Sequence, residues 1–394
     1  MDSPWDPATR ANPFPFWDRA REEAAVWPGV GPETGRTFWF VTRHETCLEV
    51  FRDERIGHQP DLHVPADELY WDSLPDDDPL AVLGRNMLFV DPPDHTRLRR
   101  LASGSFRKSV IQRLAPRVEE VAAGLLAATG PGEPFDLMAS FAEPLPVTII
   151  AELLGVPRSD QDKFRAWTKS ILAPSFEQAQ VGAMEFVGYL NDLAEARRAD
   201  PRDDMVTELV HVEDGGERLD HTEYLAMVFL LLVAGHETTV NLVGNGTLAL
   251  SHHPDERSRW AGDPGLGPTA VEELVRFCGP VETATVRYAY EDLEVAGTSI
   301  PRGNPVIPAL YAANRDPRRF EDPGALDLGR SPNPHIGFGF GIHHCLGAPL
   351  ARLEAEVAFR LLLDRYPTIE VVDEDIPWPE GFFLRGPERL MVVG

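Results

Sequence analysis

Residues 337–349 read Gly-Phe-Gly-Phe-Gly-Ile-His-His-Cys-Leu-Gly-Ala-Pro, and we expect the chain to be organised around the cysteine in this stretch. Glycines alternate through its first half, where they can take backbone angles closed to other residues and let a flat ligand approach the main chain. Cys345 stands just before residues 346–354, which are predicted to open a helix. A thiolate at a helix N-terminus is stabilised by the helix dipole and by the first backbone N–H groups. The stretch therefore predicts a ligand-binding loop whose reactive atom is the sulfur of Cys345.

The spacing of this loop, Phe338-x-x-Gly341-x-x-x-Cys345-x-Gly347, resembles the cysteine loop of the cytochrome P450 family, the haem-thiolate monooxygenases. The resemblance implies that Cys345 is the fifth ligand of the iron in haem b, and that its electron donation favours O–O cleavage. It also implies that Phe338, Gly339 and Gly347 contact the haem.

Other interpretations of this stretch fit its spacing less well. A buried cysteine is usually a small hydrophobic side chain. His343-His344-Cys345 suggests zinc, but structural zinc sites draw on spaced pairs such as Cys-x-x-Cys, which the chain lacks. The glycines have neither the Gly-x-Gly-x-x-Gly spacing nor the Gly-Lys-Ser/Thr ending of phosphate loops. We therefore adopt haem binding, with His344 either tuning the thiolate by a hydrogen bond or facing the surface.

A single long helix is predicted from His221 to His252, with Asp220 as its N-cap. Its middle reads Leu232-Val233-Ala234-Gly235-His236-Glu237-Thr238-Thr239 and resembles the helix on the distal side of the haem in the same family. His236-Glu237 does not continue into the zinc-protease motif His-Glu-x-x-His, because residue 240 is valine.

Four residues of that motif predict its chemistry. Ala234 and Gly235 have almost no side chain and would leave room for dioxygen. Thr238 can bond the carbonyl of Ala234, four residues back, which bends a helix and opens its hydrogen-bond ladder. Cleavage of the O–O bond needs two protons, and Glu237 with Thr238 form an acid–alcohol pair suited to relaying them. We predict that Glu237 and Thr238 are catalytic; the alternative is that Thr238 is an ordinary helix residue.

A second motif, Asp-Pro-Pro-Asp-His-Thr-Arg-Leu-Arg-Arg, begins at residue 91 and predicts a helix with Asp94 as N-cap. His95 and Arg99 stand four apart and hence on one helical face. The two propionates of haem need cationic or hydrogen-bond-donating partners, and arginine binds carboxylates in a bidentate fork. The family resemblance assigns this role to His95, Arg99, Arg287 and His343.

The segment from Arg97 to Arg117 holds seven basic residues and no acidic one, in a chain whose formal net charge is −26. A local positive patch on a negative protein can steer an acidic partner to one docking face. By the resemblance, we expect an acidic ferredoxin to dock there. The candidate contact residues are Arg100, Arg107, Lys108, Arg113 and Arg352.

Further residues are assigned by the resemblance. Glu273 and Arg276, three apart on one helical face, are expected to form a structural ion-pair network joined by Arg330. Residues 57–86, rich in Asp, Pro and Gly, are expected to roof the substrate pocket. The pocket itself is expected to be lined by Leu230, Val233, Ala234, Thr283, Thr285, Phe382 and Phe383.

Composition limits the partners and the location. The negative net charge argues against nucleic acid and anionic membranes. Three scattered cysteines do not suit a disulfide framework. The N-terminus lacks the features of a signal peptide, and the most apolar run, near 224–235, is expected to be too short to span a bilayer. We therefore expect a soluble, cytoplasmic protein of the bacterial type.

Together these features predict a mostly α fold with a small β lobe (α+β), in a single cytochrome P450 haem domain over residues 1–394. The predicted reaction inserts one oxygen atom from dioxygen into a small to mid-sized, largely apolar molecule, with hydroxylation foremost. Electrons would come from NAD(P)H through a ferredoxin reductase and a ferredoxin. Two alternatives stay open, a peroxide-driven peroxygenase and a non-catalytic haem protein that senses or carries a ligand.

Overall fold

The computed structural model describes residues 3–32, 35–69, 75, 78–171, 175–213 and 216–394. The chain forms two compact units. The sheet unit consists of residues 1–70, 119–143 and 238–394, and the helical unit consists of residues 71–118 and 144–237. The prediction of a single domain over the whole chain stays a prediction.

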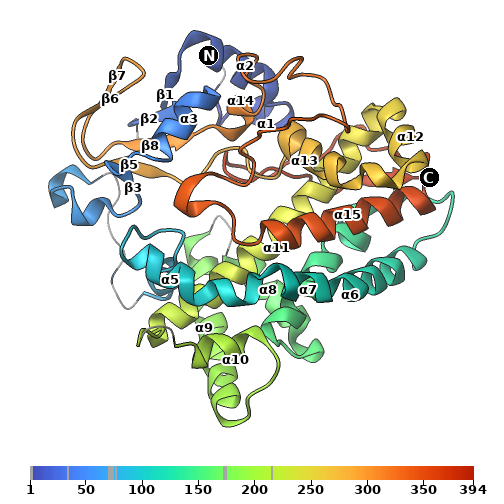
Figure 1. The fold of residues 1–394 in the computed structure, drawn as a ribbon, viewed down its shortest axis with the longest axis horizontal. Coiled ribbons are helices and arrows are strands. Elements are labelled where there is room, and N and C mark those ends of the chain that lie inside the picture. The colour runs from blue at the N-terminus through green and yellow to red at the C-terminus, as the bar shows by residue number, and fades with distance from the viewer. Residues whose placement is uncertain (1–2, 33–34, 70–74, 76–77, 172–174, 214–215) are drawn as a thin grey trace. The chain divides into compact units, whose positions relative to one another are not determined.

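All the strands found in the described residues belong to the sheet unit. They are β1 (Val26–Val30), β2 (Thr37–Val41), β3 (Ile56–Gly57), β4 (Phe135–Asp136), β5 (Arg287–Ala289), β6 (Leu293–Val295), β7 (Thr298–Ile300), β8 (Pro305–Pro308), β9 (Glu370–Val371) and β10 (Met391–Val393). The largest sheet has the order β1-β2-β8-β5-β3, while β4-β10-β9 and β6-β7 form two smaller ones. β2 runs parallel to β8, so early and late segments of the chain lie side by side, blue and orange in Figure 1.

Strand β2 is filled by β-branched and aromatic side chains of high β propensity. Phe38 and Phe40 point to one face, where they join a buried aromatic cluster with Trp17 and Tyr311. Trp39 points to the other face and packs on an aliphatic cluster. The sheet is therefore covered by apolar side chains on both faces.

Helices surround these sheets in the same unit. They are α1 (Pro7–Ala11), α2 (Phe14–Glu23), α3 (His44–Val50), α12 (Pro254–Gly262), α13 (Gly267–Cys278), α14 (Leu310–Ala313) and α15 (Ala348–Arg365). Helix α2 ends at Glu23, shortly before Val26 begins strand β1. Helix α3 follows strand β2 in the chain.

The helical unit contains α4 (Pro79–Gly84), α5 (Asp94–Ala102), α7 (Pro144–Leu154), α8 (Gln161–Ile171), α9 (Phe176–Ala199) and α10 (Met205–His211), whereas α6 (Lys108–Ala127) and α11 (His221–His252) continue from it into the sheet unit.

The prediction that Asp94 caps α5 is wrong. Pro93 holds the N-cap position, and Asp94 is the first helical residue. The described part of the 57–86 segment is not wholly irregular, since it contains α4 and two short 3₁₀ helices.

The long helix α11 has the predicted bounds, His221–His252. Asp220 caps it as predicted: the Glu223 amide donates to Asp220 Oδ1 at 2.8 Å, and the Asp220 amide donates to Glu223 Oε2 at 2.9 Å. By length and composition α11 could cross a membrane, with a mean hydropathy of 1.6, so the expectation that its apolar run is too short is wrong. However, 61% of the stretch of α11 to which this hydropathy refers is buried inside the protein, as in the core helix of a soluble protein.

Candidate functional site

The cysteine loop lies in the sheet unit and ends where α15 begins. Gly339 and Gly341 have φ angles of 72° and 73°, which L side chains rarely adopt. Gly337 serves close packing instead, since a Cβ there would lie 2.5 Å from Cγ1 of Val275. The Cys345 amide donates to the Phe338 carbonyl at 2.8 Å, which folds the loop back on itself.

Cys345 differs from the other two cysteines in its environment. Cys47 and Cys278 are fully buried, and burial raises the pKa of both thiols, that of Cys278 to about 12. Both therefore remain protonated thiols. Cys345 is exposed, three residues before α15, and a Cβ on Gly347 would still lie 3.9 Å from its sulfur. The loop thus offers a single accessible sulfur, which fits the donor that a haem iron needs.

An ion-pair chain supports the loop from the side of α13. Arg352 stacks its guanidinium over the Phe338 ring at 4.3 Å and donates through Nε to Glu272 at 2.5 Å. His335 Nε2 contacts the same carboxylate at 2.9 Å. Burial raises the pKa of Glu272, but the hydrogen bonds from His335 and Arg352 outweigh it and hold the pKa at about 2. Glu272 therefore stays charged and fixes Arg352, a residue predicted at the docking face, against the loop. His344 is exposed.

Basic side chains gather beside the loop in the same unit. The His343 ring lies 4.7 Å from the His58 ring in an edge-to-face arrangement. His58 Nδ1 contacts the Val286 carbonyl at 3.0 Å, next to Arg287, whose guanidinium lies 4.8 Å from the Phe51 ring centre. His343, predicted as a propionate partner, thus contacts His58, which sequence reasoning missed and which also contacts the backbone beside the other predicted partner, Arg287. Only the pairing of β3 with β5 brings His58 there, so the sequence carried no direct signal.

The other predicted propionate partners, His95 and Arg99, lie one turn apart on α5 in the helical unit. His95 is buried, and burial, followed by the charge of Arg99, lowers the pKa of its imidazole. His95 is therefore neutral at pH 7 and acts as a hydrogen-bond donor, while Arg99 carries the charge. This donor set suits a carboxylate.

The middle of α11 is accessible although most of this helix is buried. Ala234 is exposed, and Val233, Glu237 and Thr238 are half-buried. A Cβ on Gly235 would lie 3.0 Å from Cδ1 and Cγ1 of Ile150 on α7, and the expectation that Gly235 leaves room for dioxygen stays a prediction. Gly235 permits helix packing, and Ala234 is the residue that presents a small accessible surface.

His236, considered in the sequence only as a zinc ligand, contacts the predicted catalytic acid. Its Nδ1 lies 2.8 Å from the carbonyl oxygen of Leu232, and its Nε2 lies 3.3 Å from Oε1 of Glu237. The His236 ring is 4% exposed, so these contacts fix its orientation. Nothing in the sequence distinguished this histidine from a core residue.

One residue predicted to line the pocket, Thr283, is a core residue instead. Thr283 is fully buried and donates its hydroxyl to the Phe382 carbonyl at 3.0 Å. The Phe382 ring packs against Trp5 and Phe40, with ring centres 5.5 and 5.6 Å away. Thr283 is therefore a correction, because its side chain has no surface left for a substrate, whereas Phe382 is half-buried and stays a predicted pocket residue. Among the other candidates, Leu230 is buried, Thr285 is half-buried and Phe383 is exposed.

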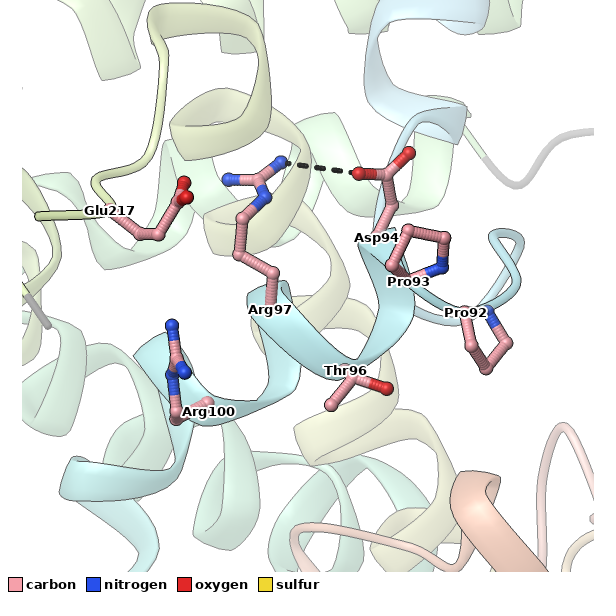
Figure 2. A pocket seen from close by; sticks show the side chains of 7 residues that line it. All are labelled: Pro92, Pro93, Asp94, Thr96, Arg97, Arg100 and Glu217. Carbon is pink, nitrogen blue, oxygen red and sulfur yellow. Dashed lines mark ion pairs between the residues drawn. The ribbon is translucent and has the colours of Figure 1, made fainter. Parts of the chain in front are cut away.

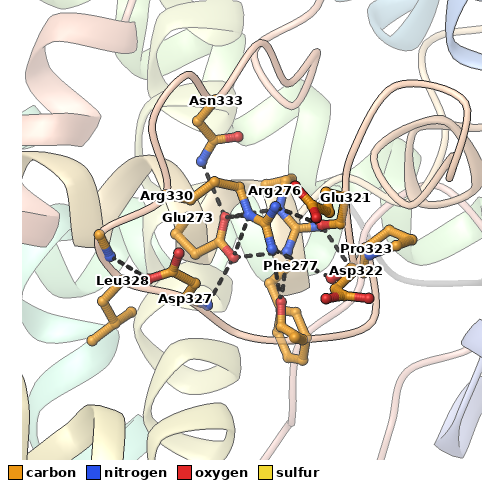
Figure 3. Close-up of polar contacts among 12 residues, drawn as sticks. Glu273, Arg276, Phe277, Glu321, Asp322, Pro323, Asp327, Leu328, Arg330 and Asn333 are labelled. Carbon is orange, nitrogen blue, oxygen red and sulfur yellow. Dashed lines mark hydrogen bonds and ion pairs between the residues drawn. The ribbon is translucent and has the colours of Figure 1, made fainter.

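The predicted ion-pair network lies on α13 behind the cysteine loop (Figure 3). Arg276 donates to both carboxylate oxygens of Glu273 at 2.7 Å, and both side chains are 0% exposed. Arg330 Nε lies 3.1 Å from the same carboxylate, and Asn333 donates to it at 3.1 Å. Arg276 also donates to the carbonyl of Pro323, so the network holds the connector that leads to the cysteine.

Figure 2 shows a different feature, an open depression of about 720 Å³ on the helical unit. Arg97 and Asp94 face each other there, 3.8 Å apart, and Arg97 also pairs with Glu223. The lining residues are Pro92, Pro93, Asp94, Thr96, Arg97, Arg100 and Glu217. None of the predicted haem or substrate residues is among them, and its charges of opposite sign neutralise one another.

The accessible sulfur of Cys345 in its glycine-rich loop fits a haem-thiolate protein. A family model described as Cytochrome P450 matches residues 268–393. The polyketide biosynthesis cytochrome P450 PksS of Bacillus subtilis (strain 168) is 41% identical over 388 residues, which cover 97% of this chain and 95% of that protein. The chain belongs to the cytochrome P450 family, is an enzyme of the monooxygenase class and binds haem b.

Solved structures agree with this assignment. The myxobacterial cytochrome P450 CYP267B1 in complex with myristic acid has a TM-score of 0.92 and 44% identity, covering 99% of this chain and 98% of that chain. P450BioI in complex with an acyl carrier protein ligated to hexadec-9Z-enoic acid has a TM-score of 0.88 and 33% identity, covering 98% of this chain and 99% of that one. The predicted fold class, mostly α with a small β lobe, is confirmed.

Proposed function

We propose that this enzyme hydroxylates a mid-sized, largely apolar molecule derived from fatty-acyl or polyketide metabolism. The observation that carries the proposal is the pair Glu237 and Thr238 on α11, beside the accessible Ala234. Insertion of one atom of dioxygen requires protons for the other atom, and an acid next to an alcohol can relay them. The substrate class is supported by the relatives, which include a polyketide enzyme and proteins bound to fatty-acyl chains.

In this proposal the chain's own residues bind and orient the haem. Cys345 would ligate the iron, and Phe338, Gly339, Gly347 and Ala234 would contact the macrocycle. The propionates would be held by His95, Arg99, Arg287 and His343, with His58 as an added polar neighbour of His343. When bound, the haem supplies the binding and activation of dioxygen.

The substrate pocket is proposed around the accessible part of α11. Val233 and Thr285 offer half-buried surface, and Phe383 offers exposed aromatic surface. Leu230 is buried at 8% exposure. These side chains are apolar except for one hydroxyl, which matches an apolar substrate.

Electron delivery is proposed to come from NAD(P)H through a reductase and an acidic ferredoxin, in the cytoplasm. Arg107, Lys108 and Arg113 are exposed around the start of α6 and can attract an acidic partner. By contrast, Arg117 donates to Glu152 at 2.7 Å, so part of the basic run is already neutralised. Arg100 remains a further candidate.

The decisive experiment is the absorption spectrum of the reduced protein under carbon monoxide, followed by turnover. A strongly red-shifted Soret band requires a thiolate opposite the gas, and Cys345→Ser should abolish it. Fatty acids and polyketide macrolactones are then screened by the spin-state shift of the haem. Product formed with ferredoxin, reductase and NADPH supports the proposal. Product formed only with peroxide would overturn the proposal in favour of a peroxygenase. Ligand binding without any product would overturn it in favour of a sensor.

A further inference from the structure

The segment between strands β9 and β10 is held by side chains and not by a regular element. The structure describes every residue from 372 to 390 and places no helix or strand among them. Its backbone meets the stretch before β5 at an isolated bridge, Val281 with Leu384, flanked by backbone hydrogen bonds. The segment carries Phe382 and Phe383, both predicted pocket residues. The contacts that fix its course therefore also fix these two side chains.

Arg10, on helix α1, reaches this segment with all three nitrogens of its guanidinium. Nε donates to the Pro379 carbonyl at 3.1 Å, and Nη2 donates to the Leu384 carbonyl at 3.0 Å. Nη1 donates to Oε2 of Glu282 at 2.5 Å. Arg10 is 4% exposed, so water competes little for these bonds. Because a guanidinium is a rigid planar fork, three simultaneous bonds define the position of the turn between Pro379 and Leu384.

A second arginine, Arg385, makes the reverse contact. Its Nε donates to the Arg10 carbonyl at 3.1 Å and its Nη2 to the Ala11 carbonyl at 2.9 Å. Both carbonyls lie at the C-terminal end of α1, where a helix leaves its acceptors without helical partners. The Arg385 guanidinium also lies 3.7 Å from the centre of the Trp378 ring. Helix α1 and the segment thus each donate an arginine to the backbone of the other.

Glu282 connects these arginines to the core. Its carboxylate is 0% exposed and also accepts a hydrogen bond from Nε1 of Trp17 on α2, at 2.8 Å. We call Arg10, Glu282 and Arg385 the arginine clamp. A buried polar network whose members are all partnered specifies one geometry, whereas apolar side chains would fill the space without direction. The clamp therefore fixes the orientation of the turn as well as its attachment.

The two phenylalanines of the turn differ in what they contact. The Phe382 ring packs against Trp5 and Phe40, with ring centres 5.5 and 5.6 Å away. Phe383 is 42% exposed, while its carbonyl accepts from the Glu282 amide at 2.9 Å. The backbone of Phe383 is thus fixed and its ring is accessible to a ligand.

We propose that Arg10 is a positioning residue for substrate selectivity, which holds the turn from Pro379 to Leu384 so that the Phe383 ring borders the substrate. The inference rests on the proposed function, which makes Phe383 a pocket residue, and adds that helix α1 controls its position. Arg10 acts through the turn and does not touch the substrate. Loss of the clamp should therefore weaken the contact of the Phe383 ring with an apolar chain.

The clamp is tested first with ligands that bind the haem iron of the holoenzyme directly, so that no substrate need be known. Imidazole and dodecylimidazole share the iron-binding ring, and only the second carries an apolar chain into the pocket. Arg10→Lys keeps the charge beside Glu282 but cannot form the fork. It should lower the affinity for dodecylimidazole relative to imidazole severalfold, with an unchanged carbon monoxide spectrum. An unchanged ratio of the two affinities would overturn the proposal.

The matched control is Arg21→Lys. Arg21 is also 4% exposed and also ties a helix near the start of the chain to a later segment, but its bonds go to the Ala312 carbonyl at 2.9 Å and to Asp18 at 2.7 Å. This variant should keep the wild-type ratio. An equal fall in both variants would overturn the proposal, because it would show a general loss of packing.

The route through the Phe383 ring is tested by a double-mutant cycle. Phe383→Ala should lower the same ratio, and Arg10→Lys should add nothing in that background. Additive effects, or no effect of Phe383→Ala, would overturn this route. Arg385→Lys removes the other half of the clamp and carries the same test if Arg10→Lys folds poorly.

Titration with lauric, myristic and palmitic acid separates this proposal from the proposed function. If none of them shifts the spin state of the wild type, a fatty-acyl substrate is excluded, while the dodecylimidazole ratio still decides the role of Arg10. If the fatty acids bind and the ratio is the same in Arg10→Lys and wild type, only the role of Arg10 is overturned.

Discussion

His236 and Glu237 are consecutive on α11, and their side chains meet, with 3.3 Å between Nε2 and Oε1. The other ring nitrogen, Nδ1, lies 2.8 Å from the Leu232 carbonyl oxygen, which can only accept a hydrogen bond. Nδ1 therefore carries a proton. The contact of Nε2 with the carboxyl group holds the Glu237 side chain in place, next in the chain to Thr238.

We predict that His236→Phe keeps the ring volume but releases Glu237. Product formed per NADPH should fall about tenfold, since a relay group typically contributes more than that, while substrate affinity stays unchanged. Oxygen and peroxide electrodes combined with product analysis check this. His211 is the matched control, because its Nδ1 also contacts the carbonyl four residues back, at 2.9 Å, and the ring is exposed on α10. If His236→Phe forms as much product per NADPH as the wild type, the pair of His236 and Glu237 has no part in the reaction.

Removal of the Thr238 hydroxyl should separate electron flow from product formation. In Thr238→Ala we expect NADPH consumption to continue, product to fall by roughly tenfold or more and peroxide to rise. The control is Thr247→Val on the same helix, which removes a hydroxyl that donates to the Val243 carbonyl at 2.8 Å. This variant should leave the product formed per NADPH unchanged. Unaltered product yield in the alanine variant would contradict the relay.

The buried acid Glu354 predicts a pH dependence of stability. Its pKa is about 8 in the folded protein against 4.5 for the ordinary group, so between these values the unfolded carboxyl ionises while the folded one stays protonated. The wild type should therefore lose stability as pH rises, by about 1.4 kcal/mol per pH unit from this group. The loss begins near pH 4.5 and levels off above pH 8.

Glu354→Gln should lack this dependence. The difference in unfolding free energy between variant and wild type should then change steadily in the variant's favour from about pH 5 to pH 8. Urea unfolding of both proteins across that range measures it, and Glu356→Gln provides the control with a flat difference. A flat difference for Glu354→Gln would mean that its carboxyl ionises normally in the folded state.

The network in Figure 3 predicts a large stability effect away from the chemistry. Arg276→Met leaves the Glu273 carboxylate buried without its main partner and should destabilise the protein by about 3–5 kcal/mol. Arg259→Met, which removes a half-exposed pair with Glu256, should leave stability nearly unchanged. Thermal unfolding of the wild type and of both variants measures these differences. Equal stability of Arg276→Met and wild type would rule out a structural role for the network.

Charge reversal tests the ferredoxin face. Arg107→Glu combined with Lys108→Glu should slow reduction by ferredoxin about tenfold and weaken the dependence of that rate on salt. Substrate affinity should not change. The control, Lys163→Glu with Arg202→Glu, alters the net charge equally at other exposed positions of the helical unit. If both double variants are slowed alike, net charge and not a docking face sets the rate.

The sequence by itself determined the elements whose local signals are strong. The bounds of β2 follow from its run of β-branched and aromatic residues, and those of α11 from its apolar length and the capping box at Asp220 and Glu223. The motif around Cys345 indicated the class of enzyme, because few arrangements of glycine, phenylalanine and cysteine repeat that spacing. These features depend on neighbours in the chain.

Only the tertiary structure decided the features that depend on distant partners. The Phe382 ring packs against Trp5, His58 contacts the backbone carbonyl of Val286 through strand pairing, and the Glu354 carboxyl becomes buried. No local pattern reveals these contacts, because a side chain's direction and its loss of water are set by elements hundreds of residues away. The ionisation of Glu354 is the clearest case, since its pKa is raised by desolvation that the fold alone produces.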